Sequence, residues 1–189
     1  MRTNELAREF NGLDLDLGPE PPVEAAPAAG GHGMAIRHRI SRTIIDRVAG
    51  RTLERIDLSG RELAEADLRG AGLAGTNLQR AMLYRATLRD AELPGADLQR
   101  ANLFEADLRG ADLERANLTG ACLSAANLSG ARLRGATLAR ASLINASLGG
   151  ADLSGADLET ATIAGARYDC RTRWPAGFNA AEHGAVSLD

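Results

Sequence analysis

A period of five residues runs from Arg51 to Cys170 and constrains the fold of this chain more than any other feature. These 120 residues divide into 24 consecutive pentapeptides. Their third position is leucine in 22 repeats, their first is alanine in 20, and their second favours Asp, Asn, Ser or Thr. A repeat this short and regular predicts a stack of similar structural units.

The spacing within each repeat indicates extended backbone rather than helix. A helix needs apolar residues every three or four positions, and a period of five makes no continuous stripe on it. On an extended segment, residues two apart share one face, so the alanine and the leucine point the same way. The fourth and fifth positions are rich in turn formers, such as Ser129-Gly130. Each pentapeptide is therefore predicted to form one short side of a coil, with alanine and leucine inside.

Several repeats, such as A-D-L-R-G at 106–110 and A-D-L-S-G at 151–155, resemble the pentapeptide-repeat family consensus A-(D/N)-L-x-x. The resemblance covers 120 of the 189 residues. It implies an all-β fold, a right-handed quadrilateral parallel β-helix with four repeats per coil and about six coils. At about 4.8 Å per layer, the rod would be roughly 29 Å long. Four early repeats depart from the pattern at the inward alanine, namely at Arg51, Ile56, Arg61 and Thr76.

The segment before the repeats divides into two parts. Residues 1–33 are rich in Pro, Ala and Gly and are predicted to form a disordered tail. Residues 34–50 carry apolar side chains at a spacing of four and four arginines against one aspartate, which predicts a basic amphipathic helix. We expect this helix to cap the first coil, with nucleic-acid or membrane binding as the alternative. Its apolar positions are Ile36, Ile40, Ile44 and Val48.

Residues 171–189 leave the five-residue period and are predicted to form a C-terminal cap. Trp174-Pro175 and Gly177-Phe178, which follow Tyr168, resemble the tail that often closes pentapeptide-repeat proteins. In some members of that family a C-terminal segment also forms a two-fold dimer, so the resemblance leaves a homodimer open here.

The sequence gives little indication of an active site. Gly70, Gly72 and Gly75 match a dinucleotide-binding spacing, but all three fall within the repeat and no crossover helix follows. All three histidines lie outside the repeats, and no cluster of metal ligands is evident. A convex rod filled with side chains should offer no catalytic cleft. We therefore expect a protein that is not an enzyme and needs no cofactor or metal.

Cysteine spacing and hydropathy indicate a cytoplasmic protein. Cys122 and Cys170 lie 48 residues apart, more than two coils, which predicts two free thiols. The chain has no run of 18 apolar residues and no apolar core of a signal peptide at its start. These features predict no contact with membranes.

Arranging the sequence at 20 residues per coil gives two groups of candidate partner-binding residues. Tyr84, Phe104 and Ile144 stack on one side, with Met82 two residues before Tyr84. An exposed apolar strip of this kind is a contact candidate, although it is also consistent with scattered surface apolar residues. A row of arginines stacks on the next side. Like charges about 5 Å apart need a partner's acidic surface or phosphates, unless neighbouring carboxylates neutralise them. The row consists of Arg69, Arg89 and Arg109.

Three functions are consistent with this surface. The first is a non-catalytic protein–protein interaction rod or scaffold. The second is implied by the resemblance: some family members mimic DNA and bind a type II topoisomerase, DNA gyrase, which they inhibit or protect from poisons. Mimicry needs an acidic surface, but residues 51–170 hold 14 Arg against 16 Asp plus Glu. The third, direct nucleic-acid binding through arginine ladders, is disfavoured by the net charge of −3.

Overall fold

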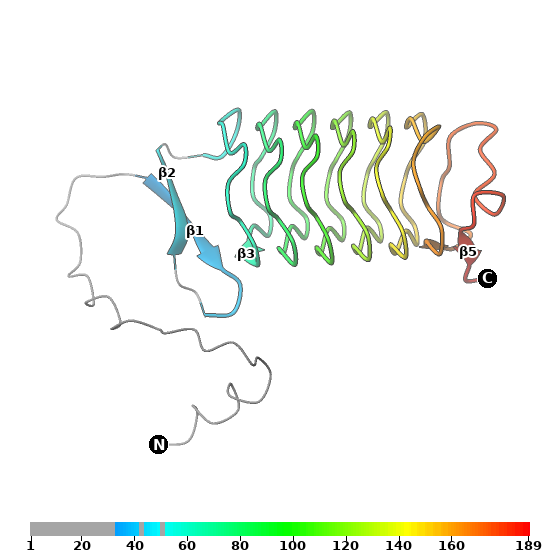
Figure 1. The fold of residues 1–189 in the computed structure, drawn as a ribbon, viewed down its shortest axis with the longest axis horizontal. Helices are drawn as coiled ribbons and strands as arrows, with labels where there is room; N and C mark the ends of the chain where they lie inside the picture. The colour runs from blue at the N-terminus through cyan, green and yellow to red at the C-terminus, as the bar shows by residue number, and fades with distance from the viewer. Residues whose placement is uncertain (1–32, 42–43, 50–51) are drawn as a thin grey trace, which may run out of the picture. The chain divides into compact units, whose positions relative to one another are not determined.

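The computed structural model describes residues 33–41, 44–49 and 52–189, and the predicted tail over 1–33 lies outside them apart from Gly33. Five strands are found in these ranges, and no helix (Figure 1). No described segment therefore has the length and apolar character of a membrane-spanning helix. The strands are β1 (Gly33–His38), β2 (Ile44–Ala49), β3 (Ala66–Asp67), β4 (Arg167–Tyr168) and β5 (Val186–Ser187).

The repeats form successive coils that pair with one another every 20 residues (Figure 1). From Asp57 to Ser147, the second residue of each repeat forms a parallel β-bridge with the second residue four repeats later, as between Thr87 and Asp107. The bridges form four ladders, one on each side of the coil, which confirms four pentapeptides per turn. We number the sides by the residue that begins each ladder: side 1 at Asp57, side 2 at Glu62, side 3 at Asp67 and side 4 at Gly72.

Leucine and alanine fill the interior, as predicted. All 22 third-position leucines are at most 3% exposed, and all but two of the first-position alanines are buried. Each coil is joined to the next by backbone hydrogen bonds, such as the Leu88 N–H to the Asp107 carbonyl at 2.7 Å. Thr76, one of the irregular early positions, is also fully buried, and its hydroxyl donates a hydrogen bond to the Leu53 carbonyl.

The fifth residue of nearly every repeat turns the corner in a left-handed conformation. Gly130 has a φ of 70°, and Arg85 and Ala125 have φ values of 57°. Glycine adopts this conformation without strain, whereas an L-residue with a Cβ is disfavoured there. The predicted turn at the fourth and fifth positions is therefore confirmed, and glycine is favoured at the fifth for a backbone reason.

We expect Gly130→Ala to lower the free energy of unfolding by about 1 kcal/mol. No atom lies within 4 Å of where the new Cβ would sit, so the loss arises from backbone conformation and not from a clash. Gly130→Asn should cost less, since asparagine tolerates left-handed backbone and Asn145 already occupies the equivalent position at φ 58°. Urea denaturation of both variants measures the difference, and equal losses would contradict the explanation.

The predicted helix over residues 34–50 is wrong. This segment contains β1 and β2, which pair antiparallel with Gly33 opposite Ala49 and Met34 opposite Val48. A spacing of four is even, so it places residues on one face of a strand as well as near one face of a helix. The β-branched Ile and Val at these positions favour the strand.

The hairpin is joined to the repeats through side 3. β1 pairs antiparallel with β3, with Arg37 opposite Asp67, and Asp67 also bridges to Thr87 in the next coil. Ile36 of β1 is 2% exposed and belongs to the same hydrophobic core as the repeat leucines. The first coil therefore meets another strand on this side instead of leaving a free edge.

Side 3 is paired at its other end as well. β5 lies parallel to β4, with Val186 opposite Arg167, the last rung of this ladder. Trp174 contacts Tyr168 edge-to-face at 5.5 Å and stacks on Phe178 at 5.4 Å, and these rings pack against the core. The role of residues 171–189 as a cap stays a prediction that these contacts favour. Side 3 thus runs from β1 to β5 with a bonded strand at each end.

Candidate protein-binding surface

The predicted apolar strip is exposed at one corner of the coil. Tyr84, Phe104 and Ile144 are 38%, 40% and 39% exposed, at the same turn position of their coils. The Arg85 N–H donates to the Phe104 carbonyl at 2.8 Å, which holds the first two turns together. Ser124 occupies the position between Phe104 and Ile144. We call Tyr84, Phe104 and Ile144 the apolar stack.

Met82 lies on the ladder of side 2, two residues before Tyr84. It is partly buried and forms the rung of side 2 that bridges Glu62 and Asn102. Cys122 is also partly buried on this ladder, and both Cys122 and Cys170 are free, as predicted. Of the four residues in the predicted apolar strip, the three exposed ones therefore lie at the turn.

Two of the three arginines in the predicted row are neutralised by a carboxylate two residues earlier. Arg69 donates from Nε to Asp67 Oδ1 at 2.8 Å and from Nη2 to Oδ2 at 2.9 Å. Arg109 donates the same pair of hydrogen bonds, which we call a fork, to Asp107 at 2.8 and 2.6 Å. These hydrogen bonds raise the pKa of both guanidinium groups and lower that of Asp107. For Arg69 and Arg109, neighbouring carboxylates therefore neutralise the charge, and no partner is needed for that purpose.

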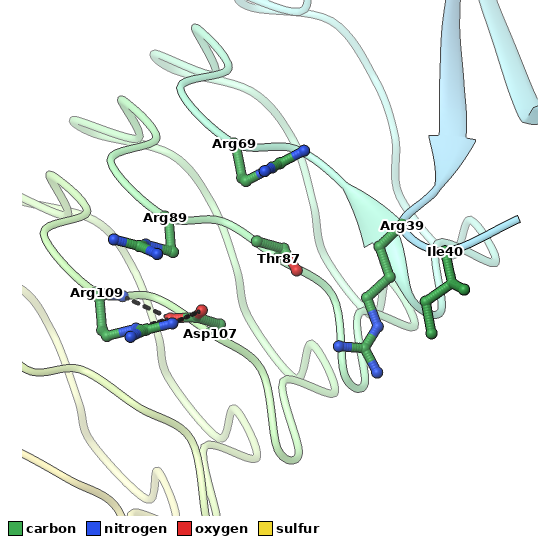
Figure 2. A pocket seen from close by; sticks show the side chains of 7 residues that line it. All are labelled: Arg39, Ile40, Arg69, Thr87, Arg89, Asp107 and Arg109. Atoms are coloured by element: carbon green, nitrogen blue, oxygen red, sulfur yellow. Dashed lines mark hydrogen bonds and ion pairs between the residues drawn. The ribbon is translucent and has the colours of Figure 1, made fainter. Parts of the chain in front are cut away.

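Arg89 is different because Thr87 stands where the neighbouring rungs have aspartate. Among the residues that the structure describes, its guanidinium has no hydrogen-bonded or ion-paired carboxylate. Figure 2 shows the side chain turned away from Thr87, whereas the Arg109 side chain folds back onto Asp107. The charge of Arg89 also lowers the pKa of Asp107, although less than the hydrogen bond from Arg109 does.

A shallow hollow of about 250 Å³ lies over this part of side 3 (Figure 2). The turn of the β1–β2 hairpin contributes Arg39 and Ile40, and Ile40 is 71% exposed. Arg39 is positioned by Glu65, whose carbonyl accepts its N–H at 2.8 Å and whose carboxylate lies 3.5 Å from its Nε. The repeat period gave no signal for these two residues. The lining comprises Arg39, Ile40, Arg69, Thr87, Arg89, Asp107 and Arg109.

The apolar stack and the arginine row flank the same side of the coil. In the coil that contains Thr87, the turn at 84–85 precedes the side formed by 86–88, and the turn at 89–90 follows it. Tyr84 therefore stands at one edge of side 3 and Arg89 at the other, with Thr87 between them. The sequence prediction placed the two groups on successive sides and missed that they border a single one.

The described ranges contain no group of three or more His, Cys, Asp or Glu side chains arranged to hold a metal ion. His183 stacks on Phe178 at 4.5 Å, and its Nδ1 lies 2.9 Å from the Asn179 carbonyl. Its contacts are therefore structural.

Comparisons with known proteins agree with the repeat architecture. The sequence profile described as "Pentapeptide repeats" matches residues 53–90, 83–120 and 121–159, with eight copies. A search of curated proteins gave no significant match.

Solved structures that match this chain include three proteins. A pentapeptide-repeat protein of the cyanobacterium Cyanothece is 33% identical, with coverage of 66% of this chain and 85% of that one and a TM-score of 0.49. HetL of the cyanobacterium Nostoc, involved in heterocyst differentiation regulation, is 38% identical over 61% and 59%, with a TM-score of 0.36. Full-length QnrB1, a plasmid-mediated fluoroquinolone resistance protein, is 18% identical over 72% and 81%, with a TM-score of 0.46.

Proposed function

Because the chain belongs to the pentapeptide-repeat family, we propose that it is a non-catalytic interaction protein that binds a protein partner along side 3. One observation carries this proposal: an exposed apolar stack and an arginine row border the same side, near the hairpin. Exposed apolar residues beside arginines are typical of contact surfaces.

The features of side 3 define the chemistry of the partner. Its ladder is bonded to β1 at one end and to β5 at the other, so a partner strand has no free edge to extend there. Recognition then depends on side chains that point outward. Tyr84 and Phe104 offer apolar surface, and Arg89 offers a guanidinium with no hydrogen-bonded or ion-paired carboxylate among the described residues. We therefore expect the partner to present apolar and acidic residues together.

The topoisomerase alternative has less support. The charges of residues 51–170 nearly balance, whereas a DNA mimic needs a dense negative surface. The likeness to QnrB1 at 18% identity concerns the fold alone. A supercoiling assay with purified DNA gyrase tests this alternative, and inhibition at low micromolar protein would favour it over the interaction rod.

Replacing both Tyr84 and Phe104 with serine tests the proposed function. We expect the double variant to lose capture of the partner by the immobilised protein from extracts of the native organism, as measured by quantitative mass spectrometry. The double variant should stay folded, with a loss of about 2 kcal/mol or less in the free energy of unfolding, because the two side chains are 38% and 40% exposed.

The matched control replaces Glu114 and Arg134 with serine at the diagonally opposite turn, two repeats away from the apolar stack. This variant should retain the partners that wild type retains. Equal retention by both double variants, or loss only in the control, would show that side 3 is not the binding surface.

A further inference from the structure

We infer that the hollow over Thr87 is a binding slot for a carboxylate, supplied by an Asp or Glu side chain of the protein partner. This inference rests on the proposed function and names the chemical group that the arginine row recognises.

The two neighbouring rungs of side 3 show what the slot lacks. In each, the carboxylate of an aspartate on the ladder accepts two hydrogen bonds from the arginine two residues later, at 2.6–2.9 Å. The middle rung has the same arginine position but carries Thr87. Threonine is shorter than aspartate and has no charge. The room that an aspartate carboxylate would fill is therefore left open between Asp67 and Asp107, and its negative charge is absent.

The pairing of the arginines around the hollow favours a single external carboxylate. Four arginines line it, but Arg39 lies beside Glu65, Arg69 pairs with Asp67, and Arg109 pairs with Asp107. The nearby Asp90 also acts on Arg109, whose pKa it helps to raise. Among the four arginines, Arg89 is the one with no hydrogen-bonded or ion-paired carboxylate in the described residues, so its guanidinium is the group left to bind an external carboxylate.

The carboxylates beside Arg89 also disfavour binding of nucleic acid. A phosphate backbone needs successive cations that are free to replace its counterions. Here the rungs above and below Arg89 already hold the carboxylates of Asp67 and Asp107, which would repel neighbouring phosphates. The site therefore fits an isolated acidic side chain better than a polyanion.

A substitution that places a carboxylate of the protein itself in the slot tests the inference. Thr87→Asp should form the fork with Arg89 that its neighbours form, and so exclude an external carboxylate. Thr87→Asn has nearly the same size as aspartate without its charge. Thr137→Asp is the matched control, because Thr137 is an equally half-buried ladder residue on side 1, with alanine two residues later.

The probe is a short peptide with blocked termini and one glutamate, Gly-Glu-Gly, titrated into each full-length protein at low salt, with the Arg89 Nε–H resonance followed by NMR. We expect a saturable shift for wild type and Thr137→Asp. Thr87→Asp should bind at least about tenfold more weakly, which corresponds to about 1.4 kcal/mol for a lost charge-assisted contact. Thr87→Asn should retain more affinity than Thr87→Asp, and added salt should weaken binding to wild type.

Several outcomes would overturn the carboxylate slot: no saturable shift in wild type, equal binding by Thr87→Asp and wild type, or tighter binding of a short DNA duplex or inorganic phosphate than of the Gly-Glu-Gly peptide. These outcomes can be separated from failure of the proposed function. Partner capture that depends on Tyr84 and Phe104 but not on Thr87, without a peptide shift, overturns the slot alone. A peptide shift abolished by Thr87→Asp, with no loss of capture in the Tyr84/Phe104 variant, supports the slot and overturns the apolar contact.

Discussion

Leu113→Ala should lower the free energy of unfolding by about 3 kcal/mol, within the range for large-to-small substitutions in packed cores. Leu113 is fully buried, and it lies in the middle of the rod, where coils on both sides restrict collapse around the cavity. For a chain of this size, the change corresponds to a fall of about 6–12 °C in Tm. Thermal and urea denaturation followed by circular dichroism measure both quantities.

Ile144→Ala is the control for this prediction. Ile144 is a similarly large apolar residue, but it is 39% exposed at a turn, so its truncation should cost about 1 kcal/mol or less. Similar losses for Ile144→Ala and Leu113→Ala would contradict the assignment of leucine to the inside of the coil.

Ala111→Leu should destabilise the protein by about 3 kcal/mol for the opposite reason. Ala111 is fully buried on the same side of the coil as Leu113, and its carbonyl accepts the Arg132 N–H of the next coil at 2.9 Å. Added methylene groups would have to displace a neighbouring leucine or separate two bonded coils. Because the interior is close-packed, either change would lower the free energy of unfolding.

Ala139→Leu provides the comparison at an outward position. Ala139 is the fourth residue of its repeat and is partly exposed, so a larger side chain can extend into solvent. We expect a change of less than about 0.5 kcal/mol in the free energy of unfolding. A loss at Ala139 as large as that at Ala111 would mean that the size of the inward residue does not limit the coil.

The repeated part of the fold could be predicted because each repeat carries the same local information. Ala and Leu two residues apart define the inward face, and turn formers such as Gly130 define the corner. The bridge between Thr87 and Asp107, 20 residues apart, repeats around the coil and along it. Tyr84 and Phe104 were correctly expected on the surface because their repeat positions point outward.

The hairpin could not be predicted in the same way. Ile36 and Ile44 are separated by an even number that fits both a strand and a helix, and the choice depends on pairing with β3, about 30 residues later in the chain. Arg39 and Ile40 reach the candidate surface only because of that pairing. The local pattern of residues 34–50 contains no information about the pairing of β1 with β3.

The special character of Arg89 was also missed. The row of three arginines was visible in the sequence, but the comparison that matters is with the residue two positions earlier. Asp67 and Asp107 neutralise their arginines, and Thr87 cannot. The sequence shows Thr87 where the neighbouring rungs have aspartate. The consequence for Arg89 becomes clear only from the paired hydrogen bonds that Asp67 and Asp107 accept from their arginines.

Photo-crosslinking from side 3 tests the central claim most directly. Benzoylphenylalanine placed at Phe104 should form a covalent adduct with the partner in extracts of the native organism, and the same group at Arg134, on the opposite turn, should not. Adduct formation at Phe104 that Thr87→Asp weakens is the result we predict. Adducts confined to position 134, or equal at both positions, would contradict binding along side 3.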